Sequence, residues 1–119
     1  MSFIYSTITI FGLTALLGMY LLSLILRGKT TPKGVSMMHG LLAVTALILL
    51  FVYAGLHPPG PVPSIIAFCM AALGGIVLIY RDVTDRPIPK WLGIGHGLLA
   101  ITGFVLLILY ALKDHSVVE

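Results

Sequence analysis

Four long apolar stretches occupy most of the chain, and each is long enough, or nearly so, to cross a lipid bilayer. A hydrocarbon core of about 30 Å needs about 20 residues of helix. Because the backbone must satisfy its own hydrogen bonds in lipid, these stretches are predicted to be helices. Only 9% of the 119 residues are charged, too few to solvate the surface of a soluble domain. The expected spans are Phe3–Leu26, Val35–Leu56, Ile65–Tyr80 and Trp91–Leu112.

The chain also contains an internal repeat. The segment His39-Gly-Leu-Leu-Ala43 returns as His96-Gly-Leu-Leu-Ala100, 57 residues further on, and the match continues without a gap. A self-match at a fixed offset indicates two copies of one structural unit. The predicted fold is a single all-α transmembrane domain over residues 1–119, a four-helix bundle of two helical hairpins at about 3–57 and 63–114. Since each copy has two spans, the repeat is parallel, about an axis along the membrane normal.

The distribution of basic residues predicts the orientation. Six of the seven Lys and Arg residues lie in the first and third loops. The positive-inside rule places these loops in the cytoplasm and both termini outside. We therefore expect a multi-pass protein of a bacterial inner membrane. Topology explains the net charge of +3, so we expect no nucleic-acid partner.

The repeat places one histidine in each copy, His39 and His96, near the cytoplasmic start of an apolar span. Ionisable groups inside a membrane are candidates for function. Helical periodicity places small residues on the same face as each histidine. These residues are Ala43 and Ala46 in the first copy, and Ala100 and Gly103 in the second. A flat macrocycle would fit such a slot, and two neutral imidazoles from opposite helices would bind its iron axially.

Further residues belong to the same hypothesis. Basic side chains near the inner interface would meet the heme propionates: Arg27, Lys33, Arg86 and Lys90. A second heme or metal site at the outer side would use His57 and His115. Tyr53 and Tyr110 are interpreted as residues of the outer aromatic belt. Close helix packing is the alternative explanation for the small residues, and it stays open.

With this histidine pair, the chain resembles the four-helix membrane b-type cytochromes, including the cytochrome b561-like group. The resemblance covers the architecture and reaches His39 and His96 residue by residue. It implies a membrane electron-transfer protein that binds heme b between the second and fourth spans. The electron donor would be a quinol or a redox protein. The chain has no Cys-x-x-Cys-His motif, so such a heme would be non-covalent.

Two other classes of function remain as alternatives. A small transporter or channel would fit four spans, but proton-coupled export usually uses a carboxylate within the membrane, and the expected spans contain none. A structural or assembly subunit without a cofactor would also carry a well-packed repeat. Whether the chain is an enzyme, as a membrane oxidoreductase, stays open. The expected partners are the bilayer, a quinone or another redox protein, and a second copy in a homodimer.

Overall fold

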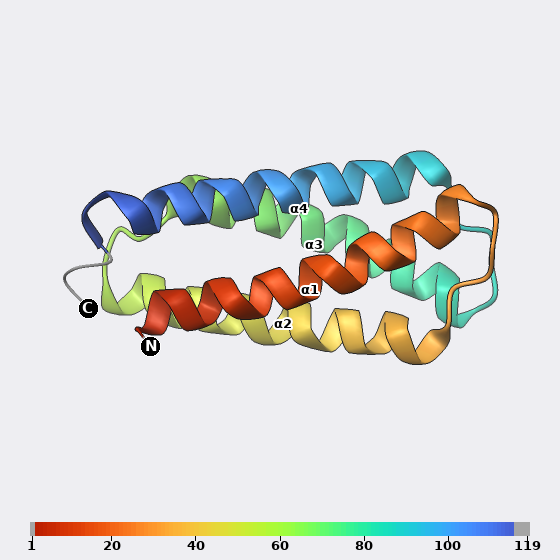
Figure 1. Cartoon of the computed structure of the whole chain (residues 1–119), viewed down its shortest axis with the longest axis horizontal. Helices are drawn as coiled ribbons and strands as arrows, with labels where there is room; N and C mark the ends of the chain where they lie inside the picture. Colours follow the sequence, from red (N-terminus) through yellow and green to blue (C-terminus); the bar gives the residue numbers. More distant parts are fainter. Residues whose placement is uncertain (1, 116–119) are drawn as a thin grey trace.

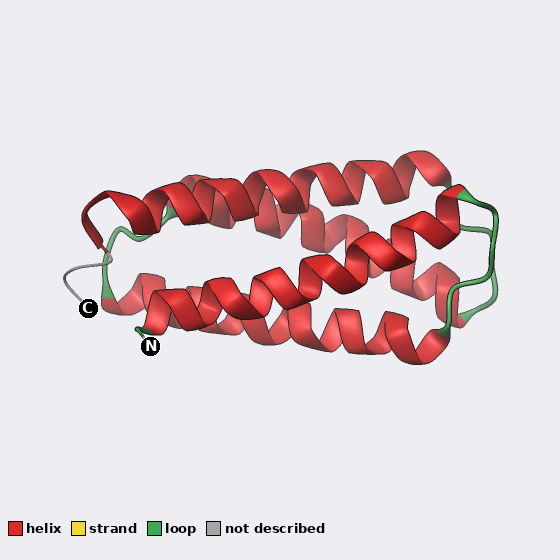
Figure 2. Cartoon of the chain, in the orientation of Figure 1, coloured by secondary structure: helices red, strands yellow, loops and turns green. Residues whose placement is uncertain are grey.

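The computed structural model describes residues 2–115, with side chains up to Lys113, and forms an elongated bundle of four helices. Figures 1 and 2 show the helices running side by side, with no β-strand among the described residues. The helices are α1 (Phe3–Leu26), α2 (Lys33–Leu56), α3 (Val62–Val83) and α4 (Lys90–Tyr110). All four are long and apolar enough to cross a membrane. The predicted four-helix membrane fold is thereby confirmed.

The helix ends differ from the sequence prediction mainly at α3, which covers 22 residues rather than the expected span Ile65–Tyr80. Pro63 lies in the first turn of α3, where its missing N–H costs no intrahelical hydrogen bond. At the other end, Arg81 and Asp82 continue the helix beyond the apolar segment. Helix α4 ends at Tyr110 and continues as a π-helical turn over Ala111–His115.

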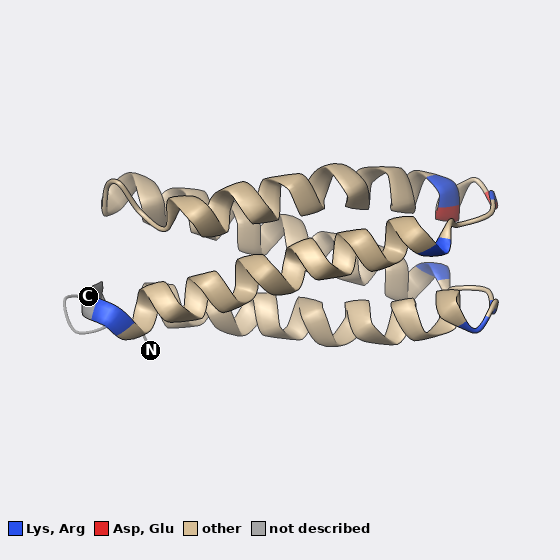
Figure 3. Cartoon of the chain, turned by 90° about the horizontal axis from the view of Figure 1, so that it is seen from above, with Lys and Arg blue, Asp and Glu red and all other residues tan. Residues whose placement is uncertain are grey.

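The two hairpins pack so that helices adjacent in sequence make the most extensive contacts, α1 with α2 and α3 with α4. Between hairpins, α1 packs on α4 and α2 packs on α3. Helices α2 and α4 therefore lie diagonally opposite each other across the bundle interior. We call the end where α1 begins and α4 ends the terminal end. The end with loops 27–32 and 84–89 is the basic end, where Figure 3 shows most of the Lys and Arg residues.

The best-packed part of the core lies toward the terminal end. Phe11 and Phe68, equivalent positions of the two copies, stack with ring centroids 4.0 Å apart and planes 5° from parallel. The Phe68 ring covers Gly103, where a Cβ would lie only 3.0 Å from a ring carbon. Ser64 donates a 2.7 Å hydrogen bond to the Gly103 carbonyl. Close packing of α3 on α4 therefore accounts for the glycine at position 103.

Tyr53 corrects one sequence-based interpretation, because it belongs to this core rather than to an aromatic belt. Its side chain is only 1% exposed and meets the rings of Phe3, Tyr110 and His57. Helix α2 directs it toward the bundle axis, on the same face as the buried residues Ala46 and Leu50. Hydropathy and position alone cannot distinguish this inward face from the lipid-facing one.

The loops at the basic end have the same backbone geometry in the two copies. The amides of Gly28 and Lys29 bond to the carbonyls of Ile25 and Leu24. The equivalent amides, of Asp85 and Arg86, bond to the carbonyls of Asp82 and Arg81. Gly28 and Asp85 both have a left-handed backbone, with φ of 69° and 56°. The repeat therefore extends from the helices into their connections.

Candidate functional site

The two histidines of the repeat occupy the same position in their helices. His39 is the seventh residue of α2 and His96 is the seventh residue of α4. Because α2 and α4 lie diagonally across the bundle and begin at the same end, the two rings meet near its axis. Their ring centroids are 6.1 Å apart, with planes at 82°.

Each imidazole is held by a backbone carbonyl of its own hairpin. His39 Nδ1 lies 2.9 Å from the Thr14 carbonyl oxygen, and His96 Nδ1 lies 2.7 Å from that of Ala71. Thr14 and Ala71 are repeat equivalents. A carbonyl oxygen can only accept a hydrogen bond, so each Nδ1 is the protonated nitrogen and donates. In a neutral ring, Nε2 then carries the free lone pair.

Glycines make this close approach possible. A Cβ at Gly18 would lie 2.8 Å from His39 Cε1, and a Cβ at Gly75 would lie 3.1 Å from His96 Cε1. Real Cβ atoms essentially never show the first of these distances. Gly18 and Gly75 are also repeat equivalents. In each hairpin the imidazole therefore packs directly on the helix backbone at a glycine. That glycine lies one turn after the residue whose carbonyl accepts the hydrogen bond from the ring.

The two rings are close enough for both to contact one bound group. If a metal ion were held here, His39 Nε2 and His96 Nε2 would be the nitrogens that bind it, because each Nδ1 is engaged by a carbonyl oxygen. An edge-to-face packing contact between aromatic rings has a similar centroid distance.

The predicted small residues fall into two groups. Ala43 and Ala100, one turn beyond each histidine, are half-buried, as are the histidines themselves. Ala46 is completely buried in the packed core, and Gly103 lies under Phe68. The interior is thus tightly packed at Ala46 and Gly103, whereas the histidines and their neighbouring alanines are partly exposed.

The four basic residues expected near a cofactor have different surroundings. Lys33 pairs with Asp85, with Nζ 2.7 Å from Oδ1. Arg27 bonds to Ser23 on its own helix, and the Arg86 guanidinium lies over the Tyr80 ring. Lys90 lines a cavity between the basic-end loops. Lys33 and Arg86 line the same cavity as Lys90, whereas Arg27 does not, so the structure brings three of the four residues to one cavity at the loops and away from the histidine pair.

Of the two histidines predicted to form a second site, the structure describes the side chain of one, His57. His57 ends α2, where its ring stacks on Tyr53 with centroids 4.4 Å apart. Its Nδ1 also lies 3.3 Å from the Tyr53 carbonyl oxygen. The side chain of His115 lies outside the part of the chain that the structure describes. Within the described part, no three His, Cys, Asp or Glu side chains gather as a metal site.

Comparisons with known proteins do not add a family to this description. The chain matches no protein-family model, and neither the curated proteins nor the solved structures include a significant match to it. The geometry of the histidine pair is thus the basis for assigning a function.

Proposed function

We propose that this protein is a membrane electron carrier that holds one heme b between His39 and His96. The observation that carries the proposal is the matched pair of imidazoles, 6.1 Å apart, each with Nδ1 engaged by a carbonyl. The donor set supports it as well. Two nitrogens leave a metal ion without its other ligands, and a porphyrin supplies four of its own while requiring axial ones.

The surrounding residues would hold and tune the axial ligands. The Thr14 and Ala71 carbonyls accept from Nδ1, which orients each ring toward the interior and makes Nε2 more basic. Gly18 and Gly75 leave space for the rings, and the apolar helices exclude water. When bound, heme b would supply reversible one-electron chemistry. The electron donor in this proposal is a quinol or a redox protein, as in the cytochrome b561-like proteins that the sequence resembles.

The absorption spectrum of the purified wild-type protein tests the assignment. After expression with ample heme supply, we expect about one heme per chain and the sharp bands of a low-spin, six-coordinate b-type heme on reduction. The competing explanation is an edge-to-face packing contact between the two rings. That explanation predicts a colourless protein, and a colourless protein under these conditions would reject ours.

The proposed orientation places the basic end in the cytoplasm and both termini outside. Its support is the clustering of Lys and Arg at one end of the bundle, shown in Figure 3. A bacterial inner membrane is the proposed location. Alkaline phosphatase fused after residue 119 should therefore be active, whereas the same enzyme inserted in loop 84–89 should be inactive. The reverse pattern would move the histidine pair toward the outer side.

A further inference from the structure

The repeat is broken at the basic end, where the second copy carries two carboxylates that the first copy lacks. Asp82 and Asp85 are equivalent by the repeat to Ile25 and Gly28. The side chains differ although the backbone is the same in the two copies, because Gly28 and Asp85 share the left-handed conformation and equivalent hydrogen bonds. The difference changes what the two equivalent lysines, Lys33 and Lys90, have as partners.

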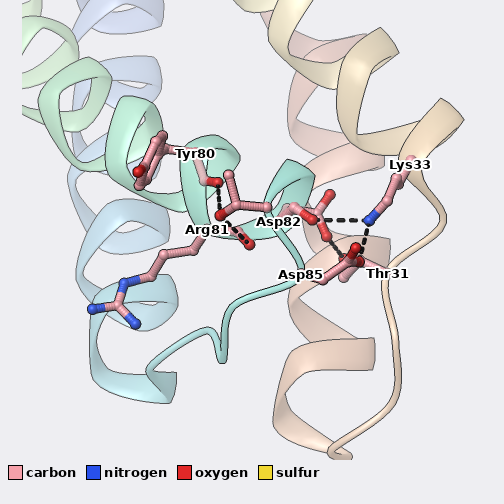
Figure 4. Close-up of polar contacts among 7 residues, drawn as sticks. Thr31, Lys33, Tyr80, Arg81, Asp82 and Asp85 are labelled. Carbon is pink, nitrogen blue, oxygen red and sulfur yellow. Dashed lines mark hydrogen bonds and ion pairs between the residues drawn. The ribbon is translucent and has the colours of Figure 1, made fainter.

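Lys33 has an anion supplied by the chain itself. Its Nζ lies 2.7 Å from Asp85 Oδ1 and donates a 2.9 Å hydrogen bond to the Asp82 carbonyl oxygen. Figure 4 shows these contacts, together with the hydrogen bond from Thr31 to Asp82 Oδ1. The loop of the second hairpin thus neutralises the lysine that opens the second helix of the first hairpin.

Lys90 opens α4 as Lys33 opens α2, but no described side chain pairs with it. In the first copy, the position equivalent to Asp85 is Gly28. A Cβ at Gly28 would meet nothing within 4 Å. The first turn of α4 contains no acidic residue. A cation at the positive end of a helix dipole is unfavourable without a counter-ion. The position that the Asp85 carboxylate fills at Lys33 is therefore open at Lys90.

A cavity of about 440 Å³ lies between the two basic-end loops at this place. Four of its lining residues are cationic: Lys29, Lys33, Arg86 and Lys90. Asp82 and Asp85 also line the cavity; Asp85 pairs with Lys33, and Asp82 is only 8% exposed. Its Oδ1 accepts from Thr31, whereas its Oδ2 is buried and accepts no hydrogen bond. A ligand that matched this cavity would carry an anion for Lys90.

We propose that this cavity binds the phosphate ester of a glycerophospholipid headgroup. The phosphate pairs with Lys90, as Asp85 pairs with Lys33. The cavity lies at the ends of membrane-spanning helices, so phosphatidylglycerol in the adjacent leaflet can supply the headgroup. The proposal does not depend on heme, because its partners are the loop residues and not the imidazoles.

Two variants test the site through the repeat itself. Lys90→Ala removes the cation, and Gly28→Asp installs the carboxylate that the second copy has, in a backbone conformation that Asp85 already adopts. Each changes the net charge by one unit, as does the control Lys113→Ala at the terminal end. Native mass spectrometry of protein from nanodiscs of phosphatidylglycerol and phosphatidylcholine measures the retained lipid. Both variants should retain phosphatidylglycerol about five- to tenfold less than wild type and the control.

The reciprocal variant should strengthen binding. Asp85→Gly frees Lys33 and removes a carboxylate from the lining of the same cavity, so retention of phosphatidylglycerol should rise above that of wild type. Titration with glycerol 1-phosphate distinguishes the lipid from a soluble ester: competition supports the phosphate site, and binding of the soluble ester without the lipid rejects the lipid source. Equal retention by wild type, Lys90→Ala and Gly28→Asp, or no gain in Asp85→Gly, would overturn the proposal.

Discussion

Replacing either His39 or His96 by alanine is expected to lower the heme content of the purified protein at least about tenfold. Under the proposed function, each variant removes one of the two imidazoles that would hold the heme, and the other would remain. The variants should fold, because the freed Thr14 or Ala71 carbonyl stays within its own helix and each histidine is only half-buried. Heme per chain is measured by the pyridine hemochrome assay, and residual heme should be high-spin.

His57→Ala is the matched control for this experiment. His57 stacks on Tyr53 at the terminal end of α2 and takes no part in the pair. Its replacement should leave the heme content and the low-spin spectrum unchanged if one heme is bound. A spectrum that survives in both His39→Ala and His96→Ala would show that the ligands lie elsewhere. Loss of a separate spectral species in His57→Ala would instead indicate a second heme.

The second large effect is expected from Gly18→Ala. The new Cβ would lie 2.8 Å from His39 Cε1, so the imidazole must move and lengthen its bond to the Thr14 carbonyl. We expect weaker heme retention and a loss of about 1–3 kcal/mol in unfolding free energy, the usual cost of overpacking. Intrinsic helix propensity would favour the alanine, so a loss cannot come from that source. Reversible unfolding in mixed micelles measures it.

Gly95→Ala provides the comparison, because a Cβ at Gly95 in α4 meets nothing within 4 Å. It should be neutral or slightly stabilising. Gly75→Ala should fall between the two, since its Cβ would lie 3.1 Å from His96 Cε1. Equal behaviour of Gly18→Ala and Gly95→Ala would mean that the His39 ring does not rest on the α1 backbone.

The sequence was sufficient to predict the four helices, because apolar length alone determines which segments can span a bilayer. It was less informative about helix ends. Pro63 and Arg81 look like boundaries in a hydropathy pattern, yet both lie within α3, where a proline in the first turn and an arginine in the last are compatible with a helix. The inward placement of Tyr53 also depends on packing that composition does not encode.

The site was predictable in part. The repeat identified His39 and His96, and the structure brings their rings together. The hydrogen-bond partners of the rings were not predicted, because they are backbone carbonyl groups on another helix. Every residue type has such a carbonyl, so the sequence does not identify which one is used. Gly18 and Gly75 were a usable signal, since they match in two helices that otherwise share little sequence. The pairing of Lys33 with Asp85 joins distant loops and required the three-dimensional structure.

The ring contacts on the bundle axis are made by equivalent residues of the two copies: Phe11 with Phe68, His39 with His96, and Tyr53 with Tyr110. Such contacts are isologous, like those across a twofold axis between identical subunits. A hairpin that encodes one phenylalanine, one histidine and one tyrosine is therefore self-complementary. Pairing two such hairpins brings one histidine from each to the same place, so a hairpin that encodes a single histidine presents two imidazoles. What covalent linkage of the copies allows is divergence at the loops, where the two halves no longer have to be the same.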